Sequence, residues 1–338
     1  MLGFYFILLF GCNRELPLVN LSGNAWGTTY SVKIISDKNI SPNISEIKLG
    51  IDSIIVDIDN QMSTYKINSE ISLFNNLPKN GAINISPGFS EVIKRSIYWS
   101  DVTLGSFDIT VFPAVINWRQ GKKDREYIDI WEPPTDLDII MQMEKIGYDK
   151  IKLSDNTLTK SIKGQMIDVN AIAKGWGVDK IFDYLELNGY TRFMVEVGGE
   201  IRVLGLNNKG QKWKIGIDKP IQGNIPGENI IEVAILNDQA MATSGNYRNY
   251  YEFDSKKYSH IIDPRNGKSI FSNISSVTVV APNCLEADVL ATALNVLSYS
   301  DGLKLIESLD GYEALWVINK ENKIFEVEVT SGMLIMLD

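Results

Sequence analysis

The only histidine of this 338-residue chain, His260, lies in the segment Tyr258–Lys268, which reads YSHIIDPRNGK. The five residues from Asp263 to Gly267 are typical of turns, so we expect His260 at a strand end, at the mouth of a tight loop. Imidazole titrates near neutral pH and suits acid–base catalysis. A hydrogen-bonded histidine that only stabilises the strand end is the alternative, and this segment alone leaves both open.

A second segment, IDVNAIAKGWGV at 167–178, could bind a phosphate group. We expect a strand that ends at Asp168 and a helix capped by Asn170, with Lys174 one turn into the helix. A helix N-terminus beside a lysine is a natural phosphate site. Gly175 and Gly177 let a ligand or another backbone come close, and glycines that serve only helix packing are the alternative.

A third segment, EADVLATALN at 286–295, could bind a metal ion. Asp288 and Thr292 are four residues apart, so on a helix both oxygen atoms lie on one face. Carboxylate, hydroxyl and carbonyl oxygens suit a hard cation such as Mg²⁺. The alternative is a polar face on an apolar helix, where Asp288 favours the helix dipole without a metal.

Three further segments combine polar and special backbone residues. GSFDITVFP at 105–113 places Asp108 and Thr110 between apolar residues, and VEVGGEI at 195–201 indicates a tight turn or bulge at Gly198–Gly199. Tyr65 lies in a polar loop between two helical patterns, where its ring could stack on a flat ligand or cover the core. The chain has no zinc-type Cys/His cluster, P-loop or G-x-S-x-G segment.

Composition indicates a folded globular protein that does not bind nucleic acid. Hydrophobic residues make up 44% and charged residues 22% of the chain, and the formal net charge is −9. An acidic protein that handles phosphates needs a local lysine or arginine, a helix N-terminus or a metal ion.

The N-terminus resembles a bacterial lipoprotein signal. An apolar run at residues 2–10 precedes Gly11 and Cys12, and it is too short to span a bilayer. We expect residues 1–11 to be a removed signal, Cys12 to carry lipid, and 12–25 to be a tether. Cys284 is then alone, so no intrachain disulfide forms.

The length allows one large domain or two modest ones, and the order of expected elements predicts the α+β class, with largely antiparallel sheets packed against helices. A long loop or insertion is expected at about 117–138. The expected strands are at 28–35, 193–197, 201–204, 213–217, 276–280, 314–318 and 324–329. The expected helices begin at Ser45, Ser86–Pro87, Asn170, Asn283 and about Gly302.

Taken in order, these segments resemble the ApbE family of FAD:protein FMN transferases, over about residues 24–332. The matching stretches are WGTTYSVKI, MSTYKINSEISLFN, GSFDITVFP, IDVNAIAKGWGVDKI, VEVGGEIRVLG, ATSGNYRNYY, SHIIDPRNGK and EADVLATAL. The resemblance implies an ApbE-like, T-fold-related architecture in a single domain over residues 26–334. It implies that the enzyme binds FAD with Mg²⁺, transfers FMN to a threonine hydroxyl of a partner protein and releases AMP.

The resemblance also implies roles for individual residues. His260 matches the base that activates the acceptor threonine. The implied FAD contacts are Trp26, Tyr65, Ser106, Phe107, Asp108, Asp168, Lys174 and Ile261. The implied metal ligands are Asp288 and Thr292 through their side chains, with Ala171 and Ala291 through backbone carbonyls.

Two positions bear on activity. Trp26 stands where the family usually has a methionine that contacts the nucleotide. Tyr65 favours the transferase over the related Mg²⁺-dependent FAD pyrophosphatases, which release FMN and AMP. The third hypothesis is a lipoprotein that binds FAD without turning it over. The expected acceptor is a subunit of a membrane redox complex. We expect the protein to be lipid-anchored to the bacterial membrane, on its periplasmic or extracytoplasmic face.

Overall fold

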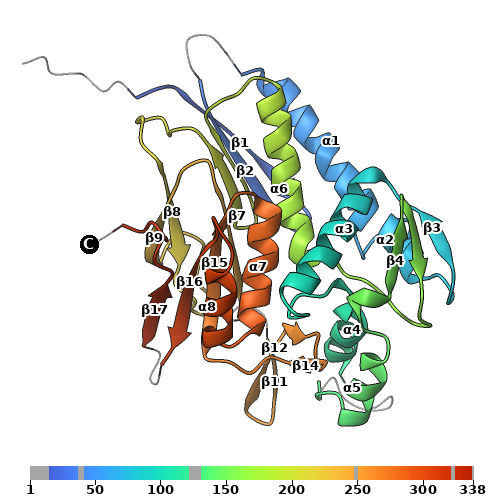
Figure 1. The fold of residues 1–338 in the computed structure, drawn as a ribbon. Helices are drawn as coiled ribbons and strands as arrows, with labels where there is room; N and C mark the ends of the chain where they lie inside the picture. Colours follow the sequence, from blue (N-terminus) through green and yellow to red (C-terminus); the bar gives the residue numbers. More distant parts are fainter. Residues whose placement is uncertain (1–14, 37–41, 122–130, 247–249, 321–323, 337–338) are drawn as a thin grey trace, which may run out of the picture.

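The computed structural model describes residues 15–36, 42–121, 131–246, 250–320 and 324–336. Within these ranges the centre is an eight-stranded sheet in the order β1-β2-β6-β7-β10-β15-β16-β17, with every neighbouring pair antiparallel (Figure 1). Its strands are β1 (Leu18–Ala25), β2 (Thr28–Ile35), β6 (Phe193–Val197), β7 (Glu200–Leu204), β10 (Ala240–Gly245), β15 (Ile274–Ala281), β16 (Glu313–Asn319) and β17 (Phe325–Val329). With the helices described below, this sheet confirms the α+β class.

One face of the sheet is covered by long helices (Figure 1). The helices of this layer are α1 (Ile44–Met62), α6 (Asn170–Leu187) and α7 (Cys284–Val296), with α3 (Pro87–Val102), α2 (Glu70–Asn75) and α8 (Tyr299–Glu307) packed around them. The buried side of α1 repeats every three to four residues at Ile47, Ile51 and Ile58, which is the spacing of one helix face. In α7 most residues are buried, as expected of a helix held between the sheet and α6.

The opposite face of the sheet is covered by a two-stranded hairpin, β8 (Trp213–Asp218) and β9 (Ile230–Leu236). Side chains such as Ile215, Ala234 and Leu236 pack there against Val203 and Val317 of the large sheet. This hairpin and the helices therefore enclose the sheet on both sides.

A smaller unit lies beside α3 and below α6 in Figure 1. It contains the three-stranded sheet β3 (Ala82–Asn84), β5 (Thr157–Lys160) and β4 (Ile151–Ser154), the helices η1 (Ile109–Val111), α4 (Phe112–Gln120), α5 (Asp136–Met143) and η2 (Tyr148–Lys150), and the hairpins β11 (Tyr250–Phe253)–β12 (Lys256–Ser259) and β13 (Ile262–Asp263)–β14 (Lys268–Ser269). Trp118, Trp131, Tyr251 and Tyr258 pack their rings together there. This cluster joins α4 to the β11–β12 hairpin that precedes His260.

Several helix starts agree with the sequence prediction. The Ser86 side chain accepts the N–H of Phe89, with Pro87 in the first turn of α3, and the Asn283 side chain accepts the N–H of Glu286 at the start of α7. The first long helix is capped by Asn43 and not by Ser45. The helix therefore begins two residues earlier than predicted, because asparagine caps a helix as well as serine does.

Two predicted irregular segments contain regular structure. Residues 18–25 of the expected tether form β1, which pairs along its whole length with β2, because the outer edge of β2 offers backbone groups that need partners. Residues 117–120 of the expected loop complete α4, and 136–138 begin α5 behind a capping box at Thr135. Residues 122–130 lie outside the described ranges, as do the expected signal at 1–11 and Cys12.

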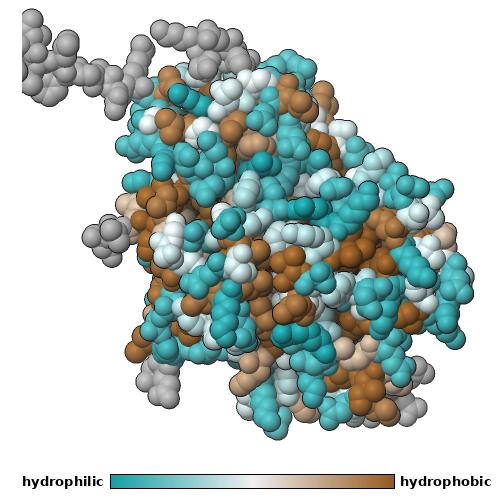
Figure 2. Space-filling view, in the orientation of Figure 1, coloured by the Kyte–Doolittle hydropathy of each residue, from teal (hydrophilic) through white to brown (hydrophobic). Residues whose placement is uncertain are grey.

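The surface in Figure 2 shows small groups of hydrophobic residues interspersed with hydrophilic ones, the mixture that a folded domain normally presents. No helix within the described ranges is both long enough and apolar enough to cross a bilayer.

Candidate functional site

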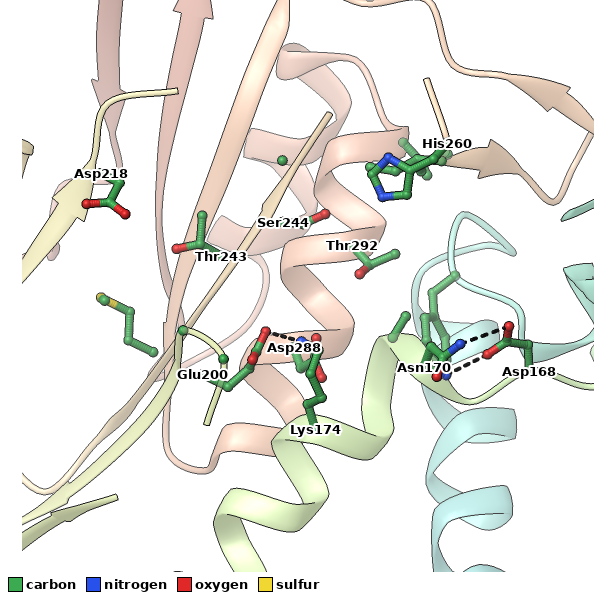
Figure 3. Close-up of a pocket in the computed structure, with 18 of the residues that line it drawn as sticks. Asp168, Asn170, Lys174, Glu200, Asp218, Thr243, Ser244, His260, Asp288 and Thr292 are labelled. Atoms are coloured by element: carbon green, nitrogen blue, oxygen red, sulfur yellow. Dashed lines mark hydrogen bonds and ion pairs between the residues drawn. The ribbon is translucent and has the colours of Figure 1, made fainter. Parts of the chain in front are cut away.

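A cavity of about 640 Å³ opens where the large sheet, the N-terminus of α6, helix α7 and the β12–β13 segment meet. Figure 3 shows side chains from all of these elements facing it. Ten of the predicted site residues line this cavity: Ser106, Phe107, Asp108, Asp168, Ala171, Lys174, His260, Ile261, Asp288 and Thr292. The structure therefore joins segments that are up to 186 residues apart in the sequence, from 106 to 292.

The centre of the cavity holds one lysine and two buried carboxylates. Lys174 forms an ion pair with Glu200, and Asp288 Oδ2 accepts the N–H of Gly175 at 3.0 Å. Burial raises the pKa of Glu200 to about 7, against the opposing charge of Lys174, and burial also raises the pKa of Asp288. Burial alone would lower the pKa of Lys174, but Asp288 and Glu200 outweigh it and hold that pKa above its ordinary value.

This centre changes the interpretation of Lys174. Its ammonium group is protonated but already paired with Glu200, so the helix start with its lysine is not a free cationic phosphate site. With both carboxylates ionised, one lysine leaves one negative charge uncompensated. A buried charge without compensation is costly, and a bound cation would remove that cost.

The oxygen atoms around this charge fit a hard divalent cation. Thr292 lies one helical turn after Asp288 and lines the same cavity. Ala171 has non-helical torsions (φ −88°, ψ 16°) at the start of α6, which turn its carbonyl out of the regular helix pattern. Glu200 Oε2 is buried and has no hydrogen-bond partner among the described residues. In those same ranges no three Asp, Glu, His or Cys side chains gather closely enough to hold a metal, so Thr292 and a backbone oxygen would have to complete an Asp288 site.

Asp168 and Asp108 shape the wall of the cavity. Asp168 accepts the backbone N–H of Asn170 at 2.8 Å and its side-chain amide at 3.1 Å. The predicted cap at Asn170 is wrong, because α6 begins at Asn170 and its N-cap position is Val169, which makes no side-chain capping bond. Asp108 accepts the N–H and the hydroxyl of Thr110, both at 2.7 Å, and the N–H of Tyr148 at 3.0 Å. Its carboxylate is thereby occupied inside the protein, whereas the buried Ser106 Oγ has no partner among the described residues.

His260 follows β12 directly and is partly buried. Its neighbours are fixed, because the Ser269 hydroxyl donates to the Ser259 carbonyl at 2.7 Å and the Ile270 N–H donates to the Ile261 carbonyl at 3.0 Å. Figure 3 shows the imidazole on the same side of the cavity as Thr292. The strand-end position predicted from the turn residues is thus confirmed, with the ring directed at the cavity.

Three predicted site residues do not line the cavity. Trp26 donates its indole N–H to the Ile55 carbonyl at 3.2 Å, and its ring lies against Gly177, where an added Cβ would come within 2.1 Å of a ring atom. Tyr65 is 84% exposed in the turn after α1. Ala291 is buried in the core within α7, where its carbonyl belongs to the helix. The FAD contacts of Trp26 and Tyr65, and the ligand role of Ala291, gain no support from this geometry.

The glycines of α6 serve helix packing. A Cβ at Gly175 would lie 2.4 Å from the Cys284 carbonyl oxygen, so this glycine allows α6 and α7 to approach closely and permits the bond from its N–H to Asp288. The packing alternative for both Gly175 and Gly177 is therefore the correct one.

Sequence reasoning missed several polar residues of the cavity wall: Arg119, Asp218, Thr243, Ser244 and, as a named site residue, Glu200. Glu200 stood in the VEVGGEI segment. The signal that could have identified it is its position, since it is a charged residue at the start of a buried strand, directly after Gly198–Gly199. Thr243 and Ser244 stood in the ATSGNYRNYY stretch without an assigned role, because only the order of strands in the sheet brings them beside α7.

Comparison with known proteins identifies the architecture. The family model described as "ApbE family" matches residues 26–316. An FAD:protein FMN transferase of Vibrio cholerae is 38% identical over 302 residues, covering 89% of this chain and 88% of the relative. The Haemophilus influenzae protein of the same name is 39% identical over 305 residues, with coverage of 88% and 86%.

Solved structures agree with this relationship. The flavin transferase ApbE of Vibrio cholerae superposes with a TM-score of 0.81 at 35% identity, covering 94% of this chain and 98% of that one. The apo form of the Pseudomonas stutzeri flavinyl transferase ApbE gives a TM-score of 0.82 at 29% identity, with coverage of 96% and 97%.

Proposed function

The chain belongs to the ApbE family, and from that premise we propose that it transfers FMN from FAD to a threonine hydroxyl of an acceptor protein, with bound Mg²⁺. The observation that supports this most directly is the single cavity that holds His260 together with Asp288 and Thr292. A base and a set of oxygen ligands at one site are what phosphoryl-group transfer to an alcohol requires.

In the proposed reaction His260 takes the proton of the acceptor threonine hydroxyl, because an unassisted hydroxyl is a poor nucleophile. The threonine oxygen forms a bond to the phosphorus on the FMN side of the FAD diphosphate. The bond from that phosphorus to the bridging oxygen breaks, and AMP leaves with the bridging oxygen and a proton. The products are an FMN–threonine phosphodiester and AMP.

The remaining cavity residues position the nucleotide. Asp288, Thr292 and the Ala171 carbonyl would hold Mg²⁺, which when bound offsets the charge of the diphosphate and polarises the phosphorus. Lys174 pairs with Glu200, and its charge opposes the rise that burial causes in the pKa of Glu200 and Asp288. Ser106 and Phe107 also line the cavity, and both side chains are buried, with no hydrogen-bond partner for the Ser106 hydroxyl among the described residues.

Incubation of the purified protein with FAD, Mg²⁺ and a threonine-containing acceptor tests this proposal. A covalently flavinylated acceptor together with AMP supports the transferase. Free FMN and AMP without acceptor labelling would identify an FAD pyrophosphatase. Unchanged FAD would leave only a protein that binds FAD.

The N-terminal segment supports a proposal about location. Gly11-Cys12 after an apolar run fits a lipid anchor on Cys12, which would hold the enzyme at the outer face of the bacterial cytoplasmic membrane or in the periplasm. A membrane redox complex subunit is then within reach as the acceptor. Cys12→Ser should move the protein from the membrane fraction to the supernatant, and unchanged fractionation would contradict the anchor.

A further inference from the structure

The backbone of β10 has a regular orientation within the sheet. In an antiparallel strand the N–H and C=O of one residue point to the same neighbouring strand, and successive residues alternate. The Val203 N–H donates to the Gln239 carbonyl, so odd-numbered residues point toward β7. The Asn246 N–H donates to the Ser275 carbonyl, so even-numbered residues point toward β15.

The neighbouring strand β7 ends before β10 does. β10 pairs with β7 only at Ala240 and Met241, because the chain turns at Gly198–Gly199 (φ +62° and +104°) and β7 begins at Glu200. On its other side β10 continues to pair with β15 as far as Gly245. Thr243 and Gly245 therefore direct their N–H and C=O groups at a place that no described strand fills.

This open edge lies inside the cavity. Thr243, Ser244 and Gly245 all belong to its lining, and Thr243 is exposed although it lies in the middle of the sheet. Backbone groups in such positions are normally paired. An edge of this kind is a site where an extended chain adds as a further strand.

We propose that the β10 edge at Thr243–Gly245 binds the acceptor protein's threonine-bearing segment in an extended conformation. This inference rests on the proposed function for its choice of ligand. Two or three main-chain hydrogen bonds would fix the segment with little dependence on its sequence, and alternation along the strand would aim one side chain at the reacting phosphate.

The position of the edge favours an acceptor segment. β10 packs on α7, where Asn295 donates to Ser244 Oγ at 3.4 Å, three residues after the proposed ligand Thr292. Figure 3 shows Ser244 between Thr243 and His260. A threonine held along this edge would share one cavity with the base and the oxygen ligands. The polar edge of the flavin ring is the other ligand that could use these backbone groups, and the experiment separates the two.

The proposal is tested by comparing the peptide affinity of a Thr243→Pro variant with that of a Thr243→Val variant. Proline removes the N–H that points to the open side, while the ladder to β15 uses the even-numbered residues. Valine keeps the N–H, and both variants lose the hydroxyl contact with Thr278. Loss of one main-chain hydrogen bond together with the added ring should weaken binding by about tenfold.

Binding is measured by fluorescence anisotropy with a synthetic peptide that spans the flavinylated threonine of a redox-complex subunit, and FAD binding is measured separately. We expect the Pro variant to bind the peptide about tenfold more weakly than the Val variant, with FAD dissociation constants within about twofold of each other. Equal peptide affinities overturn the proposal. A Pro variant that loses FAD affinity instead assigns the edge to the flavin.

A second measurement does not depend on how the variants fold. Peptides N-methylated at one residue at a time are bound to the wild-type enzyme. We expect every second N-methyl group near the threonine to weaken binding, because only alternate N–H groups face β10. A uniform effect contradicts strand addition. Since no turnover is needed, absence of flavin transfer would refute the proposed function without deciding this binding mode.

Discussion

Asp179 of α6 is predicted to hold the active-site helices together. It is 7% exposed, and its Oδ1 accepts the Cys284 N–H at 2.9 Å and the Arg202 guanidinium at 2.8 Å. Its Oδ2 accepts the Leu285 N–H at 2.9 Å. One carboxylate from α6 thus binds the first turn of α7, the helix that carries Asp288, and Arg202 in the middle of β7.

Asp179→Ala leaves two buried N–H groups and one partly buried guanidinium without their acceptor. Removing one partner of a buried ion pair typically costs about 3–5 kcal/mol. Arg202 is 21% exposed and lies 3.9 Å from Asp183, so it keeps one partial partner. We therefore expect the free energy of unfolding to fall by about 3 kcal/mol, the lower end of that range.

Urea denaturation at pH 7 measures this effect, and Asp183→Ala is the matched control. Asp183 contacts the same arginine, but its side chain is 45% exposed, so its loss should cost no more than about 1 kcal/mol. Equal destabilisation by the two variants would refute the role given to Asp179. So would a loss below ~1 kcal/mol for Asp179→Ala.

Three further predictions concern the site and one buried lysine. His260→Ala should lower the rate of flavin transfer by about 10²–10⁴-fold while FAD still binds, as loss of a general base does; a transfer rate near wild type would remove it as the base. Asp288→Asn should abolish the rise in melting temperature that Mg²⁺ gives the wild type in the absence of FAD, and an unchanged rise would place the metal elsewhere. Burial lowers the pKa of Lys160, which donates to the Asn75 carbonyl. The unfolded chain then binds more protons between the folded pKa and the ordinary lysine value, so stability of the wild type relative to Lys160→Met should rise with pH through that window. Urea midpoints of the two proteins that run parallel from pH 7 to pH 10.5 would contradict this sign.

Strong local signals made part of the fold predictable. The alternation of TTYSVKII gave β2 at Thr28–Ile35, the bounds that the structure shows, and Asn283 marked the start of α7. These elements follow from side chains close to one another in sequence. β1 was missed because its residues LVNLSGNA alternate weakly, and the strand is stabilised by the edge of β2 rather than by its own pattern.

The site residues likewise divide into those that local sequence predicts and those that depend on the fold. Asp288 and Thr292 were found because four residues bring them onto one helix face, and His260 because turn residues follow it. The pairing of Lys174 with Glu200 and the open edge at Thr243 depend on which strands are neighbours in the sheet. No local pattern encodes that order. Tyr65, expected at the nucleotide, is 84% exposed and does not belong to the cavity lining, so its contact with the nucleotide stays a prediction.

The most direct test of the central claim is the mass of an acceptor subunit after incubation with the enzyme, FAD and Mg²⁺. The account predicts that the acceptor gains the mass of FMN less one water on a threonine, that AMP appears in equal amount, and that an acceptor with this threonine replaced by alanine gains nothing. An unlabelled acceptor in the presence of released FMN and AMP would contradict the transferase, as would label retained by the alanine acceptor.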